Sequence, residues 1–250
     1  MHVKKIIFPV SFVCLLTGLM AFSTLKAKSS GVAVKNVAAI ESKHEAKTFS
    51  AEELASNLVY DSLRLGSLGL SKEAMLMAYK GQQTLAEKGI LRNDAVMAIC
   101  DFTQPSKAKR LYIIDTKNFR VLMNTYVAHG RNSGLDYAEN FSNRIESLQS
   151  SLGFYVTRGT YFGKHGLSLK LAGQEPGFND NAESRAVVVH GADYIGDNRL
   201  SSPYMGRSFG CPAVPQAQSK KIIDLLKNGT CLFIYHPTQQ YLKESKILNG

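Results

Sequence analysis

Residues 186–191 read Ala-Val-Val-Val-His-Gly, and residues 207–212 read Arg-Ser-Phe-Gly-Cys-Pro. The first stretch is an apolar, β-branched run that predicts a buried strand with His190 at its end. The second places Cys211 in a loop of small and turn-forming residues, where Gly210 permits a close backbone approach. A thiol and an imidazole on such elements are what nucleophilic catalysis at cysteine requires. A buried, inert cysteine beside an unrelated histidine is the alternative that these residues alone leave open.

Short runs of strand type continue on both sides of these two stretches. β-Branched and aromatic residues cluster in runs separated by polar turns, which indicates a chain dominated by strands from residue 95 onward. The runs lie at 96–102, 111–114, 121–128, 153–157, 167–171, 186–190 and 231–235. One helix interrupts them, because the apolar residues between 217 and 226 stand at mostly helical spacing before Asn228-Gly229.

Two helices are expected before the strands. Ser50 and Glu53 have the spacing of a capping box, and the apolar residues that follow predict a helix over 51–65. Ser71 can cap a second helix that ends at Gly89. Together they predict a helical hairpin over residues 50–90, whose apolar stripe we expect to pack on a core.

The N-terminal segment predicts export. A basic start and an apolar run over residues 6–22, ending in small residues, are typical of a bacterial secretory signal, here over residues 1–27. An uncleaved anchor is the alternative, because Leu25 is larger than the residue preferred near a cleavage site. Residues 28–49 lack a sustained period and predict a flexible tether. We therefore expect the protein in the periplasm or cell envelope of a bacterium.

Composition limits the class of protein. The chain has 250 residues, of which 44% are hydrophobic, so a sizeable core is expected and disorder over the whole chain is excluded. Lys and Arg number 30 against 20 Asp and Glu, which gives a formal charge of +10 and favours anionic partners. Nucleic acid, membranes and other anionic polymers all fit that charge.

Neither a disulfide framework nor a cofactor motif is visible. Four cysteines are too sparse for a disulfide scaffold, and we expect Cys100 and Cys231 to be separate buried thiols. The GxGxxG, GxxxxGK[ST] and HExxH motifs are absent. His44 and His236 have no partner at metal-ligand spacing, so we expect no metal and no other cofactor.

At the His and Cys motifs the sequence resembles the YkuD-type murein L,D-transpeptidase catalytic domain family. The signature of that family is a His followed, further along, by Ser-His-Gly-Cys. His190-Gly191 and Ser208-Phe-Gly-Cys211 match it, except that Phe209 replaces the second His. The matching segments lie at 122–130, 141–143, 150–155 and 206–213.

The resemblance implies a mainly β fold, an L,D-transpeptidase-like β-sandwich with mixed sheets. It would follow the helical hairpin, carry one helix after the catalytic Cys, and occupy residues 91–240. The implied partners are the stem peptides of peptidoglycan, whose carboxylates suit the basic charge, and no nucleic acid. Membrane contact would come only through an uncleaved N-terminal segment.

The resemblance also implies the reaction and the roles of three residues. A thiolate attacks the carbonyl between the third residue of a stem tetrapeptide and the terminal D-Ala, and an amine then takes the acyl group to form a 3–3 crosslink. Cys211 would be the nucleophile and His190 the general base and later acid. The Gly191 carbonyl would orient the imidazole in place of a carboxylate. The N–H groups of Gly210 and Cys211 are candidates for an oxyanion hole.

Further residues are candidates for substrate contact. Many family members carry an Arg shortly after the Cys, where this chain has Pro and Ala. Arg207 or Arg185 can take its place, unless both are solvated surface residues. Ser208 and Tyr155 lie in matching segments, and His129 stands before a Gly at a strand end, where a structural role is equally open. His165 is expected only as a turn residue.

Three functions stay open at this point. The first is a cysteine-dependent L,D-transpeptidase. The second is a Cys-His wall hydrolase, either an L,D-carboxypeptidase or an endopeptidase, because no motif reports whether an amine or water takes the acyl group. The third is a noncatalytic wall-binding module, against which the intact Cys211 and His190 count.

Overall fold

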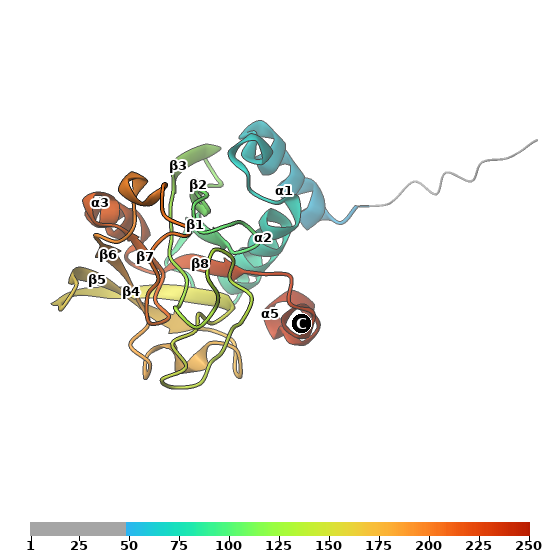
Figure 1. Cartoon of the computed structure of the whole chain (residues 1–250). Helices are drawn as coiled ribbons and strands as arrows, with labels where there is room; N and C mark the ends of the chain where they lie inside the picture. Colours follow the sequence, from blue (N-terminus) through green and yellow to red (C-terminus); the bar gives the residue numbers. More distant parts are fainter. Residues whose placement is uncertain (1–48) are drawn as a thin grey trace, which may run out of the picture. The chain divides into compact units, whose positions relative to one another are not determined.

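The computed structural model describes residues 49–250, which belong to one structural unit (Figure 1). The signal or anchor expected over 1–27 and all but the last residue of the tether lie outside the described residues, so both stay predictions. The strands are β1 (Asn93–Asp101), β2 (Leu111–Asp115), β3 (Arg120–Thr125), β4 (Gly153–Gly163), β5 (Gly166–Gly173), β6 (Val188–Ala192), β7 (Ala213–Pro215) and β8 (Thr230–Tyr235). The α-helices are α1 (Ala51–Ser62), α2 (Lys72–Glu87), α3 (Gln216–Leu226), α4 (Gln239–Glu244) and α5 (Lys246–Asn249). No helix within residues 49–250 is long and apolar enough to cross a membrane.

The eight strands form one mixed sheet in the order β3-β2-β1-β8-β4-β5-β6-β7. The pairs β1–β8 and β6–β7 are parallel, and the other neighbours are antiparallel. The mainly β fold with mixed strand directions is thereby confirmed. The helix expected after the Cys is confirmed as α3, which begins directly after β7.

The two ends of this sheet approach each other through the segment that follows β3. The amide of Ala128 donates to the carbonyl of Ala213 at 2.8 Å. Gly130 forms a parallel bridge with Ser208, whose amide donates to the carbonyl of His129 at 3.0 Å. The sheet is therefore nearly barrel-like, and the segment after β3 lies beside the loop that precedes β7. The strand expected over 121–128 ends earlier, at Thr125, because its continuation makes these loop contacts instead.

The expected helical hairpin is confirmed as α1 and α2. The amide of Glu53 donates to Ser50 Oγ at 3.2 Å, and the amide of Ser50 donates to the Glu53 carboxylate at 2.8 Å, which completes the capping box. Ser71 Oγ accepts from the amide of Ala74 at 3.1 Å and begins α2. Helix α2 packs on β1 and β8, and α3 packs on β5 and β6 (Figure 1).

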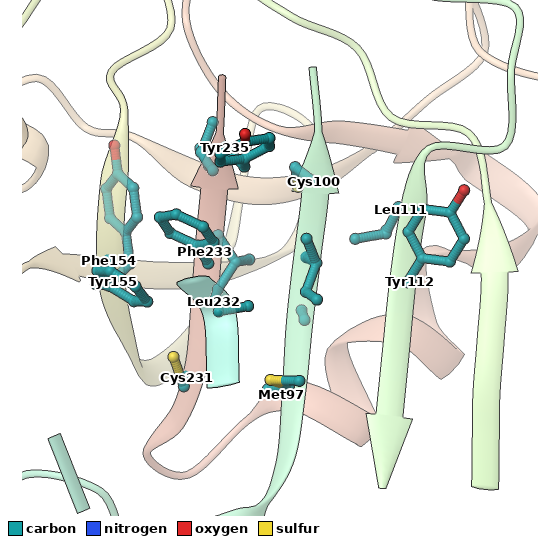
Figure 2. Close-up of a cluster of buried hydrophobic side chains, with 14 of the residues drawn as sticks. Met97, Cys100, Leu111, Tyr112, Phe154, Tyr155, Cys231, Leu232, Phe233 and Tyr235 are labelled. Atoms are coloured by element: carbon teal, nitrogen blue, oxygen red, sulfur yellow. The ribbon is translucent and has the colours of Figure 1, made fainter. Parts of the chain in front are cut away.

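A continuous core joins α2 to the centre of the sheet. The rings of Phe154 and Phe233 stack with centroids 4.1 Å apart, and a side chain at Gly81 of α2 would collide with the Phe154 ring. Figure 2 shows this cluster, with Cys100 on β1 and Cys231 on β8. Both cysteines are free and buried, as expected, and burial raises the pKa of each thiol to about 12.

Helices α4 and α5 were not anticipated, and a buried carboxylate holds them to the sheet. Glu175 accepts hydrogen bonds from the Phe154 amide at 2.8 Å, from the Tyr241 hydroxyl at 2.9 Å and from the Ser245 hydroxyl. The latter two donors belong to the C-terminal segment, so the carboxylate connects that segment to β4. Burial raises the pKa of Glu175, and its three hydrogen bonds oppose the shift.

Candidate active site

The parallel pair β6 and β7 brings the predicted catalytic residues into one region. His190 in β6 is paired with Ala213 in β7, and Cys211 precedes Ala213 by two residues. The Cys211 thiol consequently lies beside the backbone that leads into β6, where it donates to the Ala186 carbonyl at 3.7 Å. Within residues 49–250 no hydrogen bond joins this thiol to the His190 ring. His190 and the loop that carries Cys211 thus belong to neighbouring parts of the sheet, without a hydrogen bond between the two side chains in the described residues.

The loop that carries Cys211 is held in shape by Ser208. The buried Ser208 hydroxyl donates to the Cys211 carbonyl at 2.6 Å and accepts from the Gly210 amide at 3.1 Å. Gly210 has φ +120°, a conformation that residues with a side chain rarely adopt. A Cβ there would lie 2.8 Å from the Gln149 carbonyl. Ser208 therefore supports the backbone, and it is not placed for the substrate contact expected from its motif.

These contacts change the expected oxyanion hole. The Gly210 amide already donates to the Ser208 hydroxyl, so it is not a free donor in this structure. The Cys211 amide has no hydrogen-bond partner within the described part of the chain. An unpaired N–H beside an attacking thiol can stabilise an oxyanion, so one of the two expected donors is left for that purpose.

The imidazole of His190 is buried and oriented by the backbone. Its Nδ1 lies 2.8 Å from the Gly191 carbonyl. Because a carbonyl oxygen can only accept, Nδ1 carries the proton, and Nε2 is the basic nitrogen of the neutral ring. Burial lowers the pKa of His190 below 6.5, the Gly191 hydrogen bond raises it, and the nearby His165 lowers it further.

The thiol of Cys211 is un-ionised at rest. Burial raises its pKa above 9.0, whereas the Val188 amide and the Arg185 guanidinium lower it. Since the pKa of His190 moves down while that of Cys211 moves up, proton transfer from thiol to imidazole is unfavourable in the resting protein. The arrangement suits a base that takes the proton during attack.

The family model described as L,D-transpeptidase catalytic domain matches residues 67–235. The chain belongs to this L,D-transpeptidase family. No curated protein matches it.

The solved structures to which this chain is similar include further L,D-transpeptidases, at low identity. The LD transpeptidase LdtMt1 in complex with imipenem is 12% identical, with a TM-score of 0.35 over 56% of this chain and 59% of that chain. An L,D-transpeptidase from Mycobacterium smegmatis is also 12% identical, with a TM-score of 0.35 over 57% of this chain and 59% of that chain. An L,D-transpeptidase from Stackebrandtia nassauensis is 14% identical, with a TM-score of 0.35 over 65% of this chain and 66% of that chain. The alignments therefore span 59% to 66% of the length of these proteins.

In this L,D-transpeptidase domain Arg185 is not available as the expected carboxylate clamp. Its guanidinium donates to the carbonyls of Ser142 and Gln149, at 2.7 and 2.6 Å, and to the hydroxyls of Ser147 and Ser151. Burial lowers its pKa. Arg185 instead fixes the 142–151 segment beside the Cys loop, with its charge close to the thiol.

Arg207 is also held by backbone carbonyls. It donates to those of Arg131 and Gly134, at 2.8 and 3.0 Å, and its guanidinium lies 4.7 Å from the centre of the Tyr204 ring. Arg185 and Arg207, the two candidates to replace the family arginine, are therefore both engaged in structural contacts.

Two other candidates for substrate contact are core residues. His129 is 0% exposed, and its Nδ1 accepts from the equally buried Arg110 at 2.7 Å. Burial, and then the charge of Arg110, lower the pKa of His129 to about 4. Tyr155 is 0% exposed and donates to the Ser151 carbonyl at 3.0 Å. Both side chains point into the core, so the structure favours the structural role that was left open for His129 and gives Tyr155 no exposed surface for substrate contact.

Two cavities adjoin the two ends of β6. One, of about 410 Å³, meets the start of β6, and the charged side chains around it are Arg158, Lys170 and Glu183. The other, of about 400 Å³, meets the end of β6 and includes Lys164 and Asp193. Within residues 49–250, no group of three or more His, Cys, Asp and Glu side chains has the arrangement of a metal site.

His165 is the residue that sequence reasoning missed. It lies in the turn between β4 and β5, and its ring stacks on that of His190, with centroids 4.2 Å apart and an angle of 23° between the planes. The sequence predicted a turn there, but no local pattern indicated that the turn reaches β6.

Proposed function

We propose that this protein is a cysteine-dependent L,D-transpeptidase that acts on the stem peptides of peptidoglycan. It cleaves a stem tetrapeptide before the terminal D-Ala and transfers the acyl group to an amine, which forms a 3–3 crosslink. The observation that carries the proposal is the contact of His190 Nδ1 with the Gly191 carbonyl at 2.8 Å, on the strand adjacent to the Cys211 loop. That contact leaves Nε2 free to act as a base.

Acylation begins with a proton transfer. The Cys211 side chain turns about its Cα–Cβ bond, away from the Ala186 carbonyl and toward His190. Nε2 takes the thiol proton as Sγ attacks the carbonyl carbon of the third stem residue. The imidazolium then gives that proton to the nitrogen of D-Ala, the C–N bond breaks, and a thioester remains on Cys211.

The negative charge that forms on the carbonyl oxygen needs a donor. The Cys211 amide is unpaired within residues 49–250, and it is adjacent to the attacking atom in the same residue. The positive charge of Arg185, close enough to lower the pKa of Cys211, adds stabilisation of the same sign.

Deacylation reverses these roles. An amine of a second stem peptide attacks the thioester carbonyl, and Nε2 of His190 removes its surplus proton. The C–S bond breaks, and the proton returns to Sγ. If water attacks instead, the product is a tripeptide, and the protein is an L,D-carboxypeptidase.

The charges around the cavity at the start of β6 suit an anionic peptide. Arg158 and Lys170 are cations on its rim, and Glu183 is an acid that can meet an ammonium group. The chain as a whole is also positively charged, with a formal charge of +10. A stem peptide carries carboxylates, so both observations support a wall substrate. We further propose export to the periplasm or cell envelope, where that substrate lies.

Product analysis distinguishes the possible activities. The purified protein is incubated with a disaccharide-tetrapeptide, and the products are separated by mass spectrometry. We expect 3–3 dimers together with released D-Ala. Tripeptides alone would identify a hydrolase, and an unchanged substrate would identify a noncatalytic module.

A covalent adduct tests the nucleophile separately. One structural relative is described as a complex with imipenem, so imipenem is a suitable probe. We expect one adduct on the wild type, located at Cys211, and none on Cys211→Ala. Cys100→Ala is the matched control, because that thiol is buried in β1 and should leave the adduct intact. An adduct that survives Cys211→Ala would overturn the assignment.

A further inference from the structure

The turn between β4 and β5 places a second imidazole on the candidate base. Gly163 and Gly166 are paired at the end of the two strands, and only Lys164 and His165 lie between them. The His165 side chain is exposed, whereas His190 is 3% exposed. The two rings are near parallel, at 23°, with centroids 4.2 Å apart. An exposed ring stacked on a buried one covers a face of the buried ring.

The stack leaves the reactive edge of His190 unaffected. Its Nδ1 is already fixed by the Gly191 carbonyl, at 2.8 Å, in the plane of the ring. Stacking restricts the ring along the direction that an in-plane hydrogen bond does not control. The hydrogen bond and the stack together therefore define both the tautomer and the tilt of the imidazole, with Nε2 free.

We propose that His165 is a positioning residue of the catalytic site, holding the His190 imidazole by ring stacking from the tip of the β4–β5 hairpin. This inference rests on the proposed function, in which His190 is the general base. The tip of the β4–β5 hairpin, which is remote from the His and Cys motifs in sequence, would then contribute to positioning the catalytic base.

The charge of His165 gives the stack a second consequence. A protonated His165 disfavours a proton on His190, so it lowers the pKa of that ring, in addition to the larger effect of burial. The other titratable groups around the pair are Lys164 in the same turn, Asp193 and Tyr194 after β6, Cys211 before β7 and Lys170 on β5. The α3 side chains that face Gly191 are the uncharged Gln216 and Ser219.

The test compares two replacements of His165. His165→Phe keeps an aromatic ring without a charge, and His165→Ala removes the ring. The readout is the rate of adduct formation between imipenem and Cys211. A stacked aromatic pair contributes about 0.5 to 1.5 kcal/mol, so we expect His165→Ala to lose about 2- to 12-fold in rate. His165→Phe should regain most of this loss.

The pH profile separates positioning from general support of the fold. In His165→Phe the acid limb of the rate, which reports His190, should move to higher pH, because a neighbouring cation is gone. Phe162→Ala is the control on the same hairpin, since this side chain is 83% exposed and should change neither rate nor profile. Thermal unfolding verifies that all variants fold.

The outcomes are distinct. If the wild type forms no adduct, the proposed function fails. If the wild type reacts and both His165 variants react at the same rate with the same profile, the positioning role is wrong while the proposed function stands. If Ala and Phe lose rate equally, stacking is not the cause and the inference is overturned.

Discussion

Alkylation of Cys211 by iodoacetamide should accelerate steeply with pH across the neutral range. Burial raises the pKa of this thiol above 9.0, and burial lowers the pKa of His190 below 6.5. Between these two values the resting pair consists of a neutral thiol and a neutral imidazole. The alternative, a thiolate paired with an imidazolium, would be ionised throughout the same range.

The expected size of the effect follows from the shifted pKa. Since the pKa of Cys211 exceeds 9.0, less than about 1% of the thiol is ionised at pH 7. Below the pKa the thiolate fraction rises by about tenfold for each pH unit, and the thiolate is the species that reacts. Rates at pH 6, 7 and 8 should therefore differ by about tenfold at each step. A preformed ion pair would give nearly constant rates.

The assay follows one peptide. Trypsin releases Cys211 in a fragment over residues 208–220 that contains no other cysteine, and mass spectrometry quantifies its alkylation. His190→Ala is the companion variant. It should retain the same slope, because the imidazole does not hold a thiolate at rest, while its reaction with imipenem is lost. A flat wild-type rate from pH 6 to pH 8 that becomes steep in His190→Ala would refute the neutral pair.

Three further predictions concern the group that orients His190, the loop that carries Cys211, and Glu175, which connects the C-terminal segment to β4. Asp193→Asn should retain most transpeptidation, whereas His190→Ala should lose about 10²- to 10⁴-fold, since the imidazole contacts a backbone carbonyl; equal losses in two folded variants would identify a carboxylate as the third member. Gly210→Ala should lower the free energy of unfolding by about 1 to 3 kcal/mol, because of φ +120° and a Cβ 2.8 Å from the Gln149 carbonyl, and an unchanged urea midpoint would contradict this. The folded-state pKa of Glu175 is raised above 4.5, so its contribution is fully present below that pH and declines as pH rises through the raised value. Glu175→Gln should abolish this decline, and a difference in melting temperature from the wild type that does not vary with pH would count against it.

The sequence was sufficient to predict the elements on which the candidate site is built. An apolar β-branched run ending in His190-Gly191 predicts a strand end, and the strand β6 is found there. The contact between the His190 ring and the Gly191 carbonyl is the one that the family resemblance implies. The capping box of α1 and the Ser71 N-cap of α2 are local features that the sequence likewise predicts.

The direction in which each side chain points, into the core or toward the cleft, could not be predicted in the same way. A motif shows that His129 and Tyr155 belong to the matching segments, but both are 0% exposed. Whether a strand residue faces the core or the cleft depends on the partner strands and on long-range partners such as Arg110, which hydrogen-bonds His129. The stack of His165 on His190 has the same origin, since it depends on how the β4–β5 hairpin returns over β6.

The replacement of a carboxylate by a carbonyl at His190 has a chemical consequence. A carboxylate beside Nδ1 would raise the pKa of the imidazole and stabilise its cation, whereas the Gly191 carbonyl supplies only a dipole, and the net shift of the pKa is downward. The neutral ring is then a weaker base toward the thiol, but its conjugate acid is a stronger acid toward the leaving nitrogen. Because an amide amine is a poor leaving group until it is protonated, a weak base that becomes a strong acid favours the second half of acylation. The raised pKa of Cys211 compensates in part for the weaker base, since a thiol that resists ionisation gives a more nucleophilic thiolate once the proton has moved.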